Sequence, residues 1–135
     1  MSADIKNIIF EEKSLLKELL QLLDNQYDFL LGDDVVKIDK VARDLEDLSK
    51  KLAKAEIERR KIMGTDVLSV IEKINDEALS HAYTEIQSLL LNIENQKEAN
   101  EKLLKNRIFY TKKMLNMLNP QRQNQTYNAY GQMKK

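Results

Sequence analysis

Residues 35–63 read VVKIDKVARDLEDLSKKLAKAEIERRKIM, and this stretch decides the fold. Its apolar residues return at steps that alternate between three and four. They are Ile38, Val41, Leu45, Leu48, Leu52, Ala55 and Ile62, and Arg59 occupies the one remaining slot. A repeat of 3.5 residues keeps an apolar seam facing a neighbour when two helices supercoil. We therefore expect a long helix with coiled-coil packing.

Glycine and proline mark the helix ends around this stretch. Glycine favours the position just past a helix C-terminus, and proline stops a helix that precedes it. Gly32, Gly64 and Pro120 predict a first helix from about Asp4 to Leu31, a second ending near Met63, a short helix over 67–73 (VLSVIEK) and a last helix reaching Leu118. The candidate N-caps are Asp33 or Asp34, Thr65 or Asp66, and Asn75 or Asp76.

The first and last helices carry the same repeat. In the first helix the seam is Ile5, Ile9, Leu16, Leu19, Leu23 and Leu30, with Glu12 in one slot. In the last helix it is Leu79, Tyr83, Ile86, Leu90, Ile93, Leu104, Leu115 and Leu118, with Lys97 and Asn100 in polar slots. Short loops make sequential helices antiparallel neighbours.

These patterns predict an all-α protein. We expect an elongated antiparallel helical bundle with coiled-coil-like packing, built from two helices of about 28 residues, one short helix and one long C-terminal helix. Residues 1–118 would form the bundle. Residues 119–135, NPQRQNQTYNAYGQMKK, have no helical period and predict a flexible, disordered tail.

Composition narrows the class of protein. The 135 residues suggest one domain, and no run of apolar residues is long enough for membrane insertion. The absence of cysteine suits the cytoplasm, and the start does not resemble a secretory signal. The chain has 22 basic and 22 acidic residues; without the three basic residues of 119–135, 19 basic residues remain against 22 acidic ones. This balance argues against nucleic-acid binding.

Catalytic and metal-binding patterns are missing from the sequence. His81 is the single histidine, and no Glu-x-x-His motif, glycine-rich phosphate loop or serine–histidine arrangement occurs. We expect His81 to be a surface residue. We expect no enzyme activity, no metal and no cofactor.

The second half of the last helix has an apolar face that is wider than a core needs. Leu104, Ile108 and Leu115 form one edge, and Leu103, Tyr110, Met114 and Met117 form the other, across an arc of about 180°. At 1.5 Å per residue this helix is about 20 Å longer than the first two, so its end should overhang them. An exposed apolar stripe usually marks a partner site, and methionines suit an adaptable one. Packing between two neighbouring helices or a homodimer interface would also need a wide face.

Three stretches, in this order, resemble the FlgN-type flagellar export chaperones. The first is residues 8–63, a leucine-rich helix, a Gly-Asp break and the heptad helix. The second is NIENQKEANEKLLKNRIFYTKKMLNML (92–118), whose Asn95, Asn100, Leu103 and Leu104 match an Asn–Leu motif of the family. The third is TYNAYGQ (126–132), a tyrosine-then-glycine ending, although only Gly131 stands where the family usually has a glycine pair or turn.

The resemblance implies a cytoplasmic chaperone of the flagellar type III secretion system. Such chaperones hold the C-terminal helices of flagellar hook-associated proteins, which join hook and filament, and deliver them to an export-gate membrane protein. The expected client-binding residues are Asn100, Leu103, Leu104, Ile108, Tyr110, Met114, Met117 and Leu118. Gln96 and Asn100 either read the client backbone or fix the register of the helix.

The resemblance also implies that a tyrosine of the tail docks at the export gate. Tyr127 and Tyr130 both match the position. A general helical coiled-coil adaptor or a structural assembly subunit with no flagellar role is the alternative function that the sequence leaves open.

Overall fold

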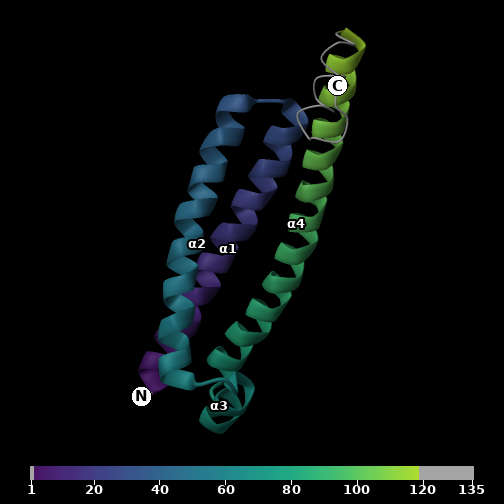
Figure 1. Cartoon of the computed structure of the whole chain (residues 1–135). Coiled ribbons are helices and arrows are strands. Elements are labelled where there is room, and N and C mark those ends of the chain that lie inside the picture. Colours follow the sequence, from purple (N-terminus) through teal and green to yellow (C-terminus); the bar gives the residue numbers. More distant parts are fainter. Residues whose placement is uncertain (1, 119–135) are drawn as a thin grey trace, which may run out of the picture. The chain divides into compact units, whose positions relative to one another are not determined.

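The computed structural model describes residues 2–118, and over this range the chain folds into four helices and no strand. They are α1 (Ser2–Gly32), α2 (Val35–Met63), α3 (Val67–Ile74) and α4 (Glu77–Leu118) (Figure 1). The predicted all-α class, the two long helices, the short helix and the long last helix are confirmed. The tail with Tyr127 and Tyr130 lies outside the described residues.

Three aspartates begin the helices that follow α1. Asp34 accepts a hydrogen bond from the Lys37 backbone N at 3.1 Å, Asp66 from Ser69 at 3.2 Å and Asp76 from Leu79 at 3.1 Å. Each side chain satisfies an N–H group that has no partner within its helix. The second member of each predicted pair is therefore the capping residue.

The turn after α1 differs from the prediction. Gly32 is the last residue of α1 and not the first residue beyond it, and the left-handed conformation falls on Asp33, with φ 59°. Aspartate and asparagine tolerate this region better than most residues. Asn75 ends α3 in the same way, with φ 55°, whereas Gly64 takes the expected positive φ after α2.

The chain divides into two compact units, Met1–Asn100 and Glu101–Lys135. Unit 1 holds α1, α2, α3 and the first part of α4, and unit 2 is described here over residues 101–118. The predicted boundary at 118/119 and the predicted overhang of the last helix stay predictions.

Polar contacts set the directions of the helices in unit 1. Arg59 of α2 pairs with Glu12 of α1, so α1 and α2 run antiparallel, as predicted. Contacts between α1 and the α4 segment follow the same order along both. Lys6 pairs with Asp76, just before α4, at 2.7 Å, Lys13 with Glu85 at 2.9 Å, and Leu23 with Asn100 at 2.9 Å. Therefore α1 and α4 run parallel, and α1 packs against both partners.

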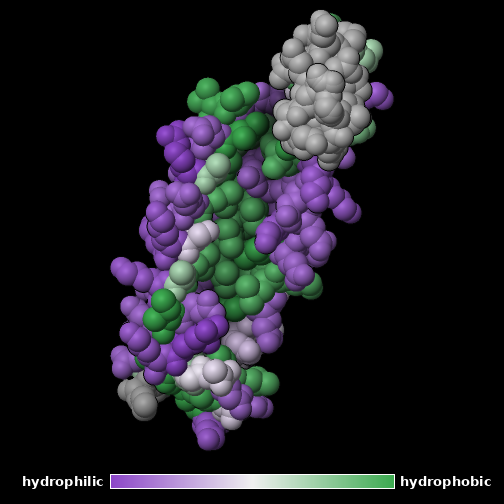
Figure 2. Space-filling model, in the orientation of Figure 1, coloured by the Kyte–Doolittle hydropathy of each residue, from purple (hydrophilic) through white to green (hydrophobic). Residues whose placement is uncertain are grey.

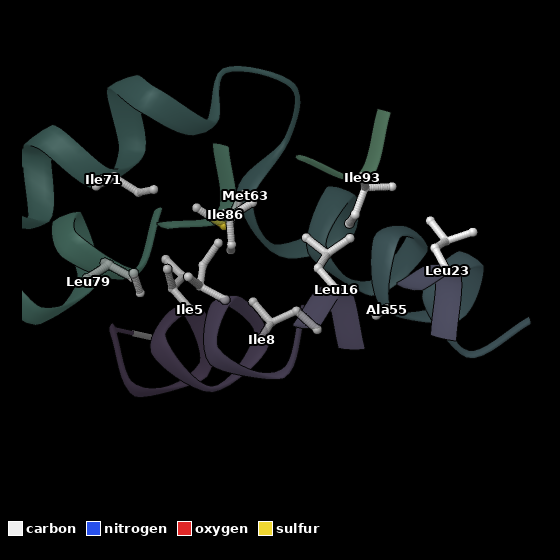
Figure 3. Packing of buried hydrophobic residues seen from close by; sticks show 12 residues of the cluster. Ile5, Ile8, Leu16, Leu23, Ala55, Met63, Ile71, Leu79, Ile86 and Ile93 are labelled. Carbon is white, nitrogen blue, oxygen red and sulfur yellow. The ribbon is translucent and has the colours of Figure 1, made fainter. Parts of the chain in front are cut away.

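The core of unit 1 takes side chains from all four helices (Figure 3). Most predicted seam residues are buried or packed against the buried cluster, but Ile62 is 38% exposed and its neighbour Met63 is 5% exposed. The prediction of Ile62 was wrong because a helix with 3.6 residues per turn drifts from a strict seven-residue repeat. After three heptads from Val41, the inward direction has passed from residue 62 to residue 63.

No described helix is both long and apolar enough to cross a membrane.

Candidate partner-binding surface

The end of α4 exposes large apolar side chains. Over residues 101–118 the exposed ones are Leu104, Ile108, Phe109, Tyr110, Met114, Met117 and Leu118, while Leu103 and Leu115 are half-buried. Tyr110 is 66% exposed, Met117 75% and Leu118 80%. These fractions are far above those of the core residues of unit 1, so the segment presents an apolar surface.

This surface consists of two parallel rows, each with the heptad repeat. We call Leu104, Ile108, Thr111, Leu115 and Leu118 the Leu row, and Leu103, Arg107, Tyr110, Met114 and Met117 the Met row. Steps of four and three place each row along one line of the helix surface. Seven of the eight predicted client-binding residues therefore belong to one continuous face of α4. Phe109 lies on the other side of the helix.

Asn100, the eighth predicted residue, has different surroundings. It is 4% exposed and belongs to unit 1. Its Nδ2 donates to the Leu23 carbonyl at 2.9 Å and to Gln26 Oε1 at 2.8 Å, and its Oδ1 accepts from Gln96 Nε2 at 2.9 Å. A buried amide with three partners fixes one register between two helices, so these contacts favour the register alternative.

Charge is distributed unevenly along the chain. Glu101 is the last acidic residue, and five basic residues follow it within α4: Lys102, Lys105, Arg107, Lys112 and Lys113. Residues 1–101 carry 14 basic and 22 acidic residues, a net charge of −8, and residues 102–135 carry 8 basic and no acidic residues, a net charge of +8. This asymmetry was not predicted, because the charge balance was taken over residues 1–118 as a whole, with α4 included.

Unit 1 has an apolar groove of about 570 Å³, which was not predicted from the sequence. Its lining comes from all four helices and includes Leu16, Leu52, Val67, Tyr83 and Leu90. Figure 2 shows this apolar surface between the polar outer sides of α2 and α4. Leu90, a predicted seam residue, is 49% exposed here, because α4 stands away from α2 along the groove.

Glu12 and Arg59, the charged residues in the two predicted seams, meet in this groove. Arg59 Nε lies 2.8 Å from Glu12 Oε1, and the two side chains are 18% and 14% exposed. Burial raises the pKa of Glu12 above its usual value, although the positive charge of Arg59 acts in the opposite direction. The sequence contains a signal for this ion pair, because Glu12 and Arg59 are opposite charges in the seams of adjacent helices.

Two other carboxylates have pKa values below the usual range. A hydrogen bond from Lys6 lowers the pKa of Asp76, and the backbone N–H of Leu79 adds to the effect. A hydrogen bond from Lys13 lowers the pKa of Glu85. His81 is a surface residue, as predicted, and its Nδ1 lies 3.0 Å from Glu85 Oε1. Over residues 2–118 no group of three histidine, cysteine or acidic residues is arranged to hold a metal ion.

Comparison with known protein families gives a match over the full length of the chain. A family model described as FlgN protein matches residues 1–135, the whole chain. No curated protein matches the chain, and no solved structure matches it.

Proposed function

The chain belongs to the FlgN family of flagellar export chaperones, and from this premise we propose that it binds the C-terminal helices of flagellar hook-associated proteins in the cytoplasm and delivers them to the export gate. In this proposal the client helices stay unassembled until the membrane protein of the gate accepts them. The chaperone remains behind and returns to a new client.

The exposed apolar face of residues 103–118 is the observation that carries this proposal. Contiguous apolar surface is costly to leave in water, and on a protein surface it marks a site of interaction. The two heptad rows suit helix-in-groove recognition, in which apolar side chains of one helix pack between those of another. Both methionines are flexible enough to pack against more than one client.

We assign client contact to the exposed and half-buried members of the predicted set. They are Leu103, Leu104, Ile108, Tyr110, Met114, Met117 and Leu118. Asn100 supports this face from unit 1, because its hydrogen bonds to Leu23 and Gln26 fix α4 against α1 just before the face begins.

Release is as important to a chaperone as capture. A client segment that is disordered before binding loses chain entropy when it forms a helix on this face. This cost offsets part of the free energy gained from apolar burial. The complex is therefore expected to have moderate affinity, which allows the client to leave at the gate.

Binding of the C-terminal segment of a hook-associated protein to the full-length chain tests the proposal. The triple variant Leu104→Ala/Ile108→Ala/Leu118→Ala should weaken binding at least about tenfold, because it removes three large side chains from the interface. Isothermal titration calorimetry measures the affinity, and circular dichroism verifies that the variant remains helical.

A matched control removes apolar side chains of similar exposure elsewhere. Val35, Val36 and Leu91 are 72%, 78% and 60% exposed, and their triple alanine variant should bind as the wild type does. Unchanged affinity of the α4 triple variant, or equal losses in both triple variants, would contradict the assignment of the client face.

A further inference from the structure

The Leu row has basic residues beside it at the positions that select coiled-coil partners. In heptad notation Leu104, Thr111 and Leu118 are d positions and Ile108 and Leu115 are a positions. Lys105 and Lys112 then fall at the two e positions between them, and both are exposed. Side chains at e and g lie along the edge of a helix–helix seam, where their charge sets which partner is accepted.

No acidic side chain of the same segment offsets this charge. Residues 102–118 contain five basic and no acidic residues, whereas residues 1–101 have a net charge of −8. A basic edge beside an apolar seam attracts acidic side chains and repels basic ones. The Leu row therefore discriminates between helices that have the same apolar face but different flanking charges.

We propose that the helix bound by the Leu row is amphipathic and carries acidic residues on both sides of its apolar seam. The inference rests on the proposed function, because it takes residues 103–118 as the client face, and it adds the chemical class of the client helix. Lys105 and Lys112 pair with the acidic flank, while the leucines and Ile108 pack against its apolar side chains.

The pattern favours a helix over an anionic membrane surface. A bilayer would bury the whole apolar arc of the segment, and Arg107, the member of the Met row nearest to the Leu row, lies near the centre of that arc. Burial of a guanidinium among acyl chains is costly. A helix seated on the Leu row leaves Arg107 at a g position on the edge of the seam, outside the apolar contact.

The test uses the full-length protein and two synthetic peptides of about three heptads. Both peptides have leucine at a and d; one has glutamate at e and g, and the other has lysine. Fluorescence anisotropy should show that the glutamate peptide binds at least about tenfold more tightly, and that its advantage shrinks as salt is raised. Equal binding of the two peptides, or binding of neither, would overturn the proposal.

Charge reversal at matched positions separates the seam from general attraction. The Lys105→Glu/Lys112→Glu variant should lose the preference for the glutamate peptide or invert it. The Lys102→Glu/Lys113→Glu variant has the same net charge, but its changes lie at b and f positions, away from the Leu row, so the preference should persist. Equal effects of the two variants would point to unspecific attraction and would reject the proposal.

Two further measurements address other occupants. If vesicles of phosphatidylglycerol and phosphatidylcholine displace the glutamate peptide while pure phosphatidylcholine does not, the face binds membranes and the proposal fails. If the protein forms dimers at low salt that the glutamate peptide does not dissociate, the acidic residues of a second copy are the occupant and the proposal fails. A monomer, or a dimer that the peptide dissociates, supports it.

The outcomes also separate this inference from the proposed function. If the glutamate peptide is preferred but no hook-associated segment binds, the proposed function fails and the acidic preference stands. If a hook-associated segment binds and the peptides are not distinguished, the acidic preference alone fails.

Discussion

Burial and the ion pair with Arg59 have opposing effects on the pKa of Glu12. Burial makes the Glu12 carboxylate unfavourable and raises its pKa, and the charge of Arg59 partly compensates. Since the pKa of Glu12 is higher in the folded state than in the unfolded state, its contribution to stability is fully present below the unfolded pKa. That contribution is lost as the pH rises through the folded pKa.

Removal of Arg59 should therefore destabilise the protein in a pH-dependent way. At pH 7, Arg59→Leu should lower the free energy of unfolding by about 2 kcal/mol, because Glu12 is left charged and mostly buried. Near pH 5 the loss should be smaller, because Glu12 takes up a proton. Urea unfolding at both pH values measures the difference in the free energy of unfolding between the variant and the wild type. Asp76 and Glu85 have lowered pKa values in both proteins, so their contributions cancel from this difference.

Arg60→Leu is the matched control, since Arg60 is 65% exposed and its ion pair with Glu56 lies on the surface of α2. The Arg60→Leu variant should lower the free energy of unfolding by less than about 0.5 kcal/mol at both pH values. Equal losses for Arg59→Leu and Arg60→Leu would show that the pair in the groove has no special role. The double variant Glu12→Leu/Arg59→Leu should recover much of the stability, because no charge remains buried.

At the scale of the helix, Asn100 decides how α4 lies on α1. The heptad pattern placed Asn100 in a seam but left open whether it fixes register or reads the client backbone. The inter-helix hydrogen bonds to Leu23 and Gln26 favour the register role, and they depend on the alignment of α1 with α4. That alignment depends on α2, α3 and the three loops that connect α1 to α4, which the repeat of a single helix does not specify.

Asn100→Ala should lower the free energy of unfolding by about 1–2 kcal/mol, because it removes hydrogen bonds and part of a buried side chain. Asn95→Ala, an exposed change on the same helix, should stay within about 0.5 kcal/mol of the wild type. Thermal denaturation measures both. If Asn100→Ala instead leaves stability intact and weakens client binding, the asparagine reads the client.

The sequence predicted the helices better than it predicted the spaces between them. Capping aspartates, Gly64 and the heptad repeats act over a few residues, so the ends of α2, α3 and α4 could be inferred closely. The groove could not be predicted from the sequence, because it depends on the distance between α4 and α2 where both pack against α1. The wide apolar arc of α4 could be inferred from the sequence, but its exposure could not, because two neighbouring helices or a second copy would also need a wide face.

At the scale of the whole molecule, client capture and delivery are assigned to different parts of the chain. The proposed client face lies within residues 103–118, and the proposed delivery signal, Tyr127 or Tyr130, belongs to the sequence beyond it. A tyrosine suits docking because it contributes a large ring with few torsions to restrict and one hydroxyl group for orientation. This separation predicts that the two activities can be lost independently.

The variant Tyr127→Ala/Tyr130→Ala should keep client affinity and lose binding of the chaperone–client complex to the cytoplasmic part of the export-gate protein. A pull-down with the purified gate fragment measures the second activity, and the two single variants identify which tyrosine is required. Tyr127→Phe/Tyr130→Phe retains both rings and serves as the control for apolar contact. Undiminished gate binding by the double alanine variant would exclude these tyrosines as the docking signal.

The parallel pairing of α1 with α4 has a consequence for synthesis on the ribosome. Lys13 and Glu85 are 72 residues apart in the chain, and Leu23 and Asn100 are 77 apart. The α1–α2 hairpin can form early, but the second face of α1 has no covering helix until residues near Asn100 have left the exit tunnel. At about 5–20 residues per second this delay lasts several seconds, during which the apolar core of a chaperone is itself open to aggregation.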